Sequence, residues 1–181
     1  MSSHAQSATA GASTLRVAAF GLAAALAAAA FARFGLEPDA FIAAYVAAVL
    51  VILSAIDIER RVIPNRIVLP SAAVVLAGQI AFYPDQAAEW ALATFGAAFV
   101  MSLPGLLSPG SIGMGDAKLC LLIGAALGKG VAVAIMLGFI SSLPVALALV
   151  AMRGPAARKQ HIPLGPFLVF GALVVLFASG A

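Results

Sequence analysis

Long apolar segments, separated by short stretches rich in glycine, proline and charged residues, make up most of the sequence. The segments are longer than ordinary strands, and this length predicts helices. They occupy residues 15–34, 41–58, 66–83, 88–107, 116–127, 131–152 and 163–181. Because about 20 mainly apolar residues are needed to cross a bilayer, most of them are long enough to span one. The pattern predicts an all-α, polytopic membrane helical bundle of seven spans, six of which form the core.

The composition supports this expectation. Of the 181 residues, 64% are hydrophobic and only 9% are charged, whereas about 25% are charged in an ordinary soluble domain. The ten basic residues are scattered singly or in pairs between apolar runs. A nucleic-acid-binding protein would gather them on one exposed face. We therefore expect the lipid bilayer, and no nucleic acid, as a partner.

The amino-terminal region has two parts. Residues 1–14 are rich in Ser, Ala, Gly and Thr, and we expect a disordered polar segment there. Residues 15–34 form an alanine-rich apolar run that suits an extra transmembrane helix or, alternatively, a cleaved signal peptide. The long polar lead, the single basic residue Arg16 and the length of the run favour a retained helix, since signal peptides have apolar cores of about 7 to 15 residues.

Basic residues predict the orientation. With a cytoplasmic amino terminus, alternating spans place eight basic residues on the inside: Arg16, Arg60, Arg61, Arg66, Lys118, Arg153, Arg158 and Lys159. Only Arg33 and Lys129 then lie outside. This asymmetry follows the positive-inside rule. It puts the loops around residues 59–65, 108–115 and 153–162 together on the cytoplasmic side.

The first of these loops contains a candidate catalytic carboxylate. Asp57 falls in the last turn of its predicted helix, and Pro64 and Asn65 predict a tight reversal, with Asn65 as the N-cap of the next helix. Alternatively, Asp57 is a boundary charge paired with Arg60 or Arg61, three and four residues on.

The second loop ends in Gly113, Gly115, Asp116 and Lys118. The apolar segment that follows is short, which suggests that it starts below the membrane surface in a protein-lined cavity. Ionisable residues at such depth are functional candidates. In the alternative interpretation, Asp116 is an N-cap carboxylate and Lys118 a surface cation.

Two aspartates on one side of a membrane suggest a specific chemistry. A pair of carboxyls that shares one proton can activate water and protonate a leaving amine, as in aspartic proteolysis. Two alternatives stay open: a small transporter or proton-conducting protein, and a serine protease using Ser111 and His161. We expect no metal and no cofactor, because the histidines are His4 and His161 alone, without a His-Glu-x-x-His motif, and Cys120 is the single cysteine.

Three motifs resemble those of the type IV prepilin peptidases. They are Asp57 followed by residues 61–66 (Arg-Val-Ile-Pro-Asn-Arg), the Gly-x-Gly-Asp-x-Lys motif at 113–118, and residues 162–167 (Ile-Pro-Leu-Gly-Pro-Phe). The resemblance implies that residues 40–181 form an intramembrane aspartyl peptidase domain in the inner (cytoplasmic) membrane. It implies Asp57 and Asp116 as the catalytic pair, and cleavage of pilin-like precursors after a glycine at the cytoplasmic face. The chain resembles the short form without the zinc-binding, methyltransferase domain.

Further residues are candidates for substrate binding or for shaping the site. They are Gly113, Gly115, Lys118, Pro64, Asn65, Pro163, Gly165 and Pro166. Of these, Pro163 suits the first turn of the last helix, while Gly165 and Pro166 loosen that turn and would let it approach the active site.

Overall fold

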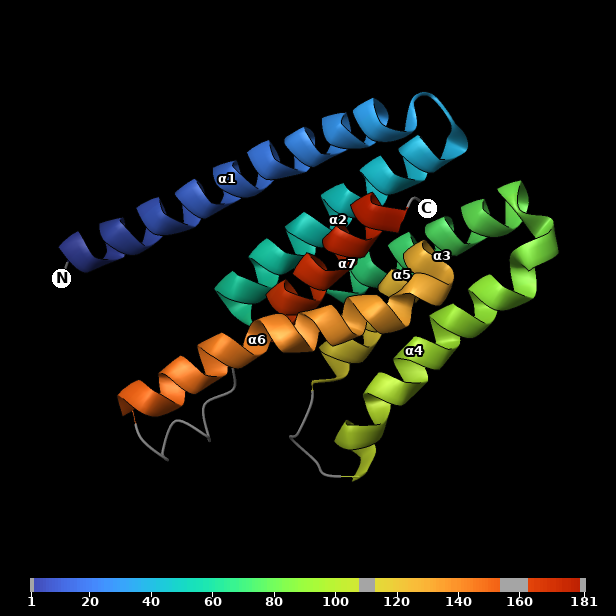
Figure 1. Cartoon of the computed structure of the whole chain (residues 1–181). Helices are drawn as coiled ribbons and strands as arrows, with labels where there is room; N and C mark the ends of the chain where they lie inside the picture. Colours follow the sequence, from blue (N-terminus) through green and yellow to red (C-terminus); the bar gives the residue numbers. More distant parts are fainter. Residues whose placement is uncertain (1, 108–112, 154–162, 180–181) are drawn as a thin grey trace.

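A computed structural model of the chain describes residues 2–107, 113–153 and 163–179, and this part is helical without strands. Seven long helices follow one another (Figure 1): α1 Ser2–Phe34, α2 Pro38–Arg60, α3 Asn65–Phe82, α4 Ala87–Leu107, α5 Met114–Leu127, α6 Val131–Arg153 and α7 Gly165–Ser179. Two short 3₁₀ turns, η1 Pro84–Gln86 and η2 Gly128–Gly130, connect α3 to α4 and α5 to α6. The all-α prediction is confirmed, and each helix overlaps one of the predicted segments.

The number of membrane spans does not follow directly from the number of helices. Five stretches are long and apolar enough to cross a membrane, and α7 adds a shorter apolar helix. One of the five, Met114–Leu149, joins α5, η2 and most of α6. With 14 residues, α5 is about 21 Å long, well below the roughly 30 Å of a hydrocarbon core. Helix length therefore does not confirm the predicted count of seven spans.

The first helix differs from the expectation at its start. It begins at Ser2, so the structure is helical over residues 2–14, where the sequence led us to expect disorder. Alanines among these residues favour helix, and the helix continues without a break into the apolar span Thr14–Phe34. That span packs mainly on α2 along one side of the bundle (Figure 1), and only 11% of it is buried, compared with 56% of α2.

Helices α2 and α5 form the centre of the bundle. α2 contacts α1, α3 and α7, whereas α5 contacts α3, α4 and α7. Most of α5 is buried, including Leu119, Leu122 and Ile123. Its Gly124 lies so close to the backbone of α4 that a β-carbon there would come within 2.8 Å of the Thr94 Cα. Small residues allow such close helix contacts in membrane proteins.

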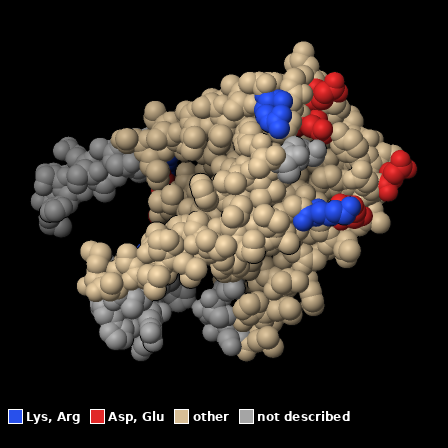
Figure 2. Space-filling view, viewed as in Figure 1, with Lys and Arg blue, Asp and Glu red and all other residues tan. Residues whose placement is uncertain are grey.

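Large apolar side chains point outwards along the helices. Leu92, Phe95 and Phe99 on α4 are each more than half exposed, and Leu147 on α6 is as well. Away from one end, the face shown in Figure 2 is almost free of charged residues. Such a large apolar surface is rare on a soluble monomer and suits contact with lipid.

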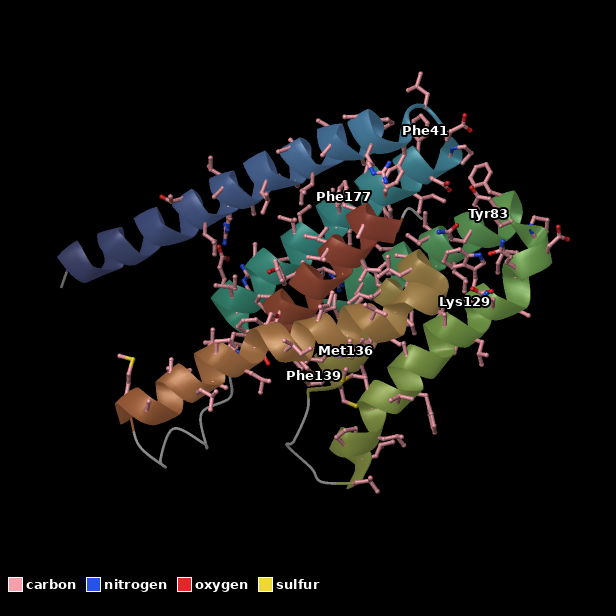
Figure 3. The ribbon with its side chains drawn as sticks, viewed as in Figure 1. Phe41, Tyr83, Lys129, Met136, Phe139 and Phe177 are labelled. Atoms are coloured by element: carbon pink, nitrogen blue, oxygen red, sulfur yellow. The ribbon has the colours of Figure 1, made fainter. Side chains whose placement is uncertain are left out.

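Charged residues gather at one end of this view, where acidic side chains predominate (Figure 2). Lys129 pairs with Glu89 at 2.6 Å, and the Tyr83 hydroxyl donates a 2.6 Å hydrogen bond to Asp39. Figure 3 shows Tyr83 and Lys129 at this end of the bundle. The hydrogen bond to Asp39 raises the pKa of Tyr83 to about 12. α2 ends and α5 begins at the opposite end of the molecule (Figure 1).

Candidate active site

Asp57 lies in the last turn of α2 and is 6% exposed. Its Oδ2 atom is buried without a hydrogen-bond partner among the described residues. None of the ion pairs in this part of the chain involves Asp57, so the alternative of a boundary charge paired with Arg60 or Arg61 finds no support there. A buried carboxyl oxygen without a partner is costly in a folded protein and calls for a functional explanation.

The chain leaves α2 through an unusual residue. Arg61 caps the helix in the left-handed conformation, with φ 53° and ψ 37°, and its backbone N–H donates a 2.8 Å hydrogen bond to the Asp57 carbonyl. Glycine is the usual residue at such a helix end. For a residue with a β-carbon, this left-handed conformation costs about 1 to 2 kcal/mol of free energy.

Asp116 lies in the first turn of α5, which begins two residues earlier than predicted. The N-cap is Gly113, whose carbonyl accepts a 3.0 Å hydrogen bond from the Asp116 backbone N–H. The alternative of Asp116 as the N-cap residue is therefore wrong. Gly115 packs on Ile63, and a β-carbon at 115 would lie 3.4 Å from the Ile63 Cβ. This contact fixes the loop after α2 against the start of α5.

These segments enclose a cavity of about 420 Å³, which we call the α2–α5 cavity. Its lining residues come from the end of α2, the loop that follows it, and the start of α3 and α5: Asp57, Arg61, Val62, Ile63, Pro64, Asn65, Gly113, Gly115, Asp116 and Lys118. The side chains of Asp57 and Asp116 are near enough to interact electrostatically. The cavity is large enough to hold water together with a short peptide segment.

Lys118 and Asn65 connect α5 to α3 at the cavity. The Lys118 ammonium donates a 2.8 Å hydrogen bond to Oδ1 of Asn65. The prediction that Asn65 caps α3 is wrong, because Pro64 occupies the N-cap position in an extended conformation and Asn65 is the first helical residue. The Pro64 carbonyl accepts hydrogen bonds from the backbone N–H groups of Ile67 and Val68, which leaves the Asn65 side chain free to bind Lys118.

The start of α7 reaches Asp57 through Gly165. A β-carbon at residue 165 would lie 3.1 Å from Cγ of Asp57, so this side of the carboxyl group is closed by glycine backbone. Pro163 precedes the helix, which begins at Gly165 rather than at Pro163. Pro166 instead lines an apolar groove between α1, α2 and α7. Gly165 thus contacts a carboxyl that lines the cavity.

Other polar residues lie outside the cavity. Glu59, two residues after Asp57, forms an ion pair with Arg16 at 3.1 Å, which ties α1 to the last turn of α2. Ser111 and His161, the residues of the serine-protease alternative, lie outside the described residues. Within the described ranges, no three His, Cys, Asp or Glu residues are arranged to hold a metal ion.

Sequence comparison adds independent evidence at this point. Residues 44–152, which contain Asp57 and Asp116, match the type IV leader peptidase family. The chain belongs to this family. Its apolar helices and its membership of the family make it an integral membrane protein. Members of the family are proteases, and this agrees with the chemistry that paired carboxyls suggest.

A relative with a known role is found in Bacillus subtilis (strain 168). Its prepilin leader peptidase/N-methyltransferase is 31% identical over 152 residues, which cover 81% of this chain and 59% of that protein. The chain therefore aligns with a little over half of its relative's length. No solved structure matches this family member.

Three residues that line the cavity, Arg61, Val62 and Ile63, were not singled out as site candidates by the sequence pattern, and Arg61 is the charged one. In the sequence it is one of two adjacent arginines at a helix end, which are typical of a cytoplasmic flank. Its left-handed backbone depends on how the loop to Pro64 packs against α5. The one feature of the sequence that could have indicated a special role for Arg61 is that no glycine occurs where this helix has to end.

Proposed function

We propose that this family member is an aspartic endopeptidase that cleaves the leader peptides of type IV pilin-like precursors. In this proposal Asp57 and Asp116 activate the water. The observation that carries it is the meeting of both carboxyls, from helices distant in the sequence, in one cavity. Membership of the leader peptidase family supplies the class of reaction and of substrate.

The two carboxyls share one proton in the resting site, because two charged carboxylates so close together repel each other. The ionised carboxylate removes a proton from water, and the water oxygen bonds to the carbonyl carbon of the scissile peptide. The protonated carboxyl gives its proton to the carbonyl oxygen. The resulting diol breaks down when the first carboxyl, now protonated, gives its proton to the nitrogen and the second, now ionised, takes a proton from a hydroxyl of the diol. The C–N bond breaks, and the leader is released with a new carboxyl terminus.

The remaining candidates act as supports. Gly113, Gly115 and Gly165 leave room around the carboxyls, and Pro64 with Asn65 directs the loop after α2. Lys118, hydrogen bonded to Asn65, holds the start of α5 against α3. We assign Pro163 and Pro166 to the start of α7, which presents Gly165 to Asp57.

The proposed location is the inner membrane, with the cavity open to the cytoplasm. Support comes from charge: Arg60, Arg61, Arg66 and Lys118 belong to the cavity end, whereas acidic residues predominate at the other end (Figure 2). The positive-inside rule assigns the basic end to the cytoplasm. A leader peptide that has not crossed the membrane would reach the cavity from this side.

The test uses purified full-length protein in detergent with a leader-bearing pilin precursor. Asp57→Asn and Asp116→Asn should each reduce cleavage by a factor of at least about 1,000, because neither the base nor the shared proton can be replaced by an amide. Glu59→Gln is the matched control, since Glu59 also lies in the last turn of α2 but does not line the cavity. Cleavage by either Asn variant at the wild-type rate would refute the assignment of Asp57 and Asp116 as the catalytic pair. Ion transport in sealed vesicles without any cleavage would favour the transporter alternative.

A further inference from the structure

Arg61 combines two features that occur together nowhere else in the described residues. It is the non-glycine residue with positive φ in this part of the chain, and it lines the cavity that holds both aspartates. Strained backbone conformations persist where the surrounding structure enforces them, and they cluster at functional sites. Both features therefore raise the question of what the Arg61 side chain contributes.

Packing does not explain why an arginine occupies this position. The residue is exposed, and none of the side-chain hydrogen bonds or ion pairs in the described part of the chain involves its guanidinium. The helix-capping hydrogen bond to the Asp57 carbonyl uses only the backbone N–H, which every residue except proline provides. Glycine would cap the helix equally well and without strain.

The surroundings of the guanidinium suggest its ligand. Arg61 is near enough to Asp57 to attract its carboxylate, yet no ion pair forms between them in the described part of the chain. The other cation of the cavity, Lys118, is already hydrogen bonded to Asn65. Arg61 thus brings five N–H donors without protein partners to a cavity where peptide carbonyl groups would be bound.

We propose that the Arg61 side chain binds the carbonyl oxygen of the scissile peptide bond and stabilises the partial negative charge that develops there as water adds, before the protonated carboxyl has transferred its proton to the same oxygen. This inference rests on the proposed function. Charged donors aimed at a developing oxyanion are among the largest contributions to acyl-transfer catalysis. Arg61 is then a catalytic residue in addition to the two carboxyls, and its left-handed backbone lies where the chain turns from α2 into the loop that lines the cavity.

The decisive variant is Arg61→Gly. It keeps the backbone N–H and prefers the left-handed conformation, so only the side chain is lost. We expect an equal or higher midpoint of thermal unfolding together with a fall in kcat of about 100-fold, the usual effect of removing one oxyanion donor. Arg61→Lys, which keeps the charge but not the planar fork, should recover part of this loss.

Arg60→Gln is the matched control, because Arg60 is the neighbouring arginine and does not line the cavity. It should cleave at close to the wild-type rate. A second readout uses a phosphinate peptide, which carries the charge and shape of the transition state. Arg61→Gly should weaken the binding of this analogue far more than the binding of an uncleaved peptide.

Two results would overturn the inference. One is an Arg61→Gly variant with wild-type kcat, and the other is an equal loss of affinity for the phosphinate and the peptide. Asp57→Asn in the same assay tests the proposed function separately. If that variant is inactive while Arg61→Gly is fully active, the carboxyl pair stands and only the role of Arg61 is refuted.

Discussion

Gly165 and Asp57 lie so close together that a β-carbon on residue 165 would be 2.5 Å from Oδ2 of Asp57. The two residues come from α7 and α2, 108 positions apart in the sequence. Their contact covers one side of the carboxyl with backbone and leaves the side facing the α2–α5 cavity open. The start of α7 thereby belongs to the wall of the proposed active site.

Gly165→Ala should therefore reduce cleavage. The added methyl group cannot fit beside Oδ2, so either α7 or the carboxyl must move, and misplacement of a catalytic group by about 1 Å can lower rates 100-fold. We expect a loss of at least about tenfold in kcat, measured with the precursor assay. Gly78→Ala is the control, because a β-carbon there meets its nearest neighbour at an ordinary 3.8 Å. Wild-type activity of Gly165→Ala would show that the contact does not constrain Asp57.

The hydrogen bond between Lys118 and Asn65 should be detectable as a coupling energy. Because it joins a residue near the start of α5 to the first residue of α3, each single change, Lys118→Met or Asn65→Ala, removes the same interaction. A double-mutant cycle of unfolding free energies should give a coupling of about 1 kcal/mol. Additive effects of the two changes would mean that the bond contributes nothing in the membrane or in detergent.

The packing of α5 on α4 predicts opposite effects for two glycines. Gly124→Ala places a methyl group against the α4 backbone and should destabilise the fold by about 1 to 3 kcal/mol. A β-carbon on Gly96 of α4 would meet nothing within 4 Å, so Gly96→Ala should be neutral or stabilise the helix by up to about 1 kcal/mol. The midpoints of thermal unfolding of the two variants, measured in the same detergent, compare these effects. Equal effects of the two substitutions would contradict the close contact.

The sequence predicts most of this architecture because lipid imposes simple rules. Segment 66–83 became α3, Asn65–Phe82, since apolar runs bounded by glycine, proline and charge leave little choice of helix ends. Asp57 and Asp116 were predicted as the catalytic pair from their residue types, their positions and the motifs around them. The roles of Asn65 and Arg61 depended on the loop between α2 and α3, whose path is decided by Ile63 packing on Gly115. Such contacts between distant residues are not encoded in a periodic pattern.

The hydrogen bond from Tyr83 to Asp39 predicts a pH effect at the other end of the molecule. The pKa of Tyr83 is raised to about 12 from an ordinary value of about 10. Because the pKa is higher in the folded protein, the hydrogen bond to Asp39 stabilises the fold fully below about pH 10, and this contribution is lost as the pH rises through about 12. An ultraviolet titration measures the pKa of Tyr83, and the variant Tyr83→Phe identifies its signal. Asp39→Asn should lower the pKa, and an unchanged pKa would rule out Asp39 as the cause.

The volume of the α2–α5 cavity has a further consequence for the bilayer. At about 30 Å³ per molecule in the liquid, a space of about 420 Å³ corresponds to a dozen or so waters. They would fill a space at the start of α5, a helix about 9 Å too short for the hydrocarbon core. Water in this space would lie beside Asp57 and Asp116, which both line it. Proton exchange between the aspartates and the aqueous phase can then occur without any helix moving.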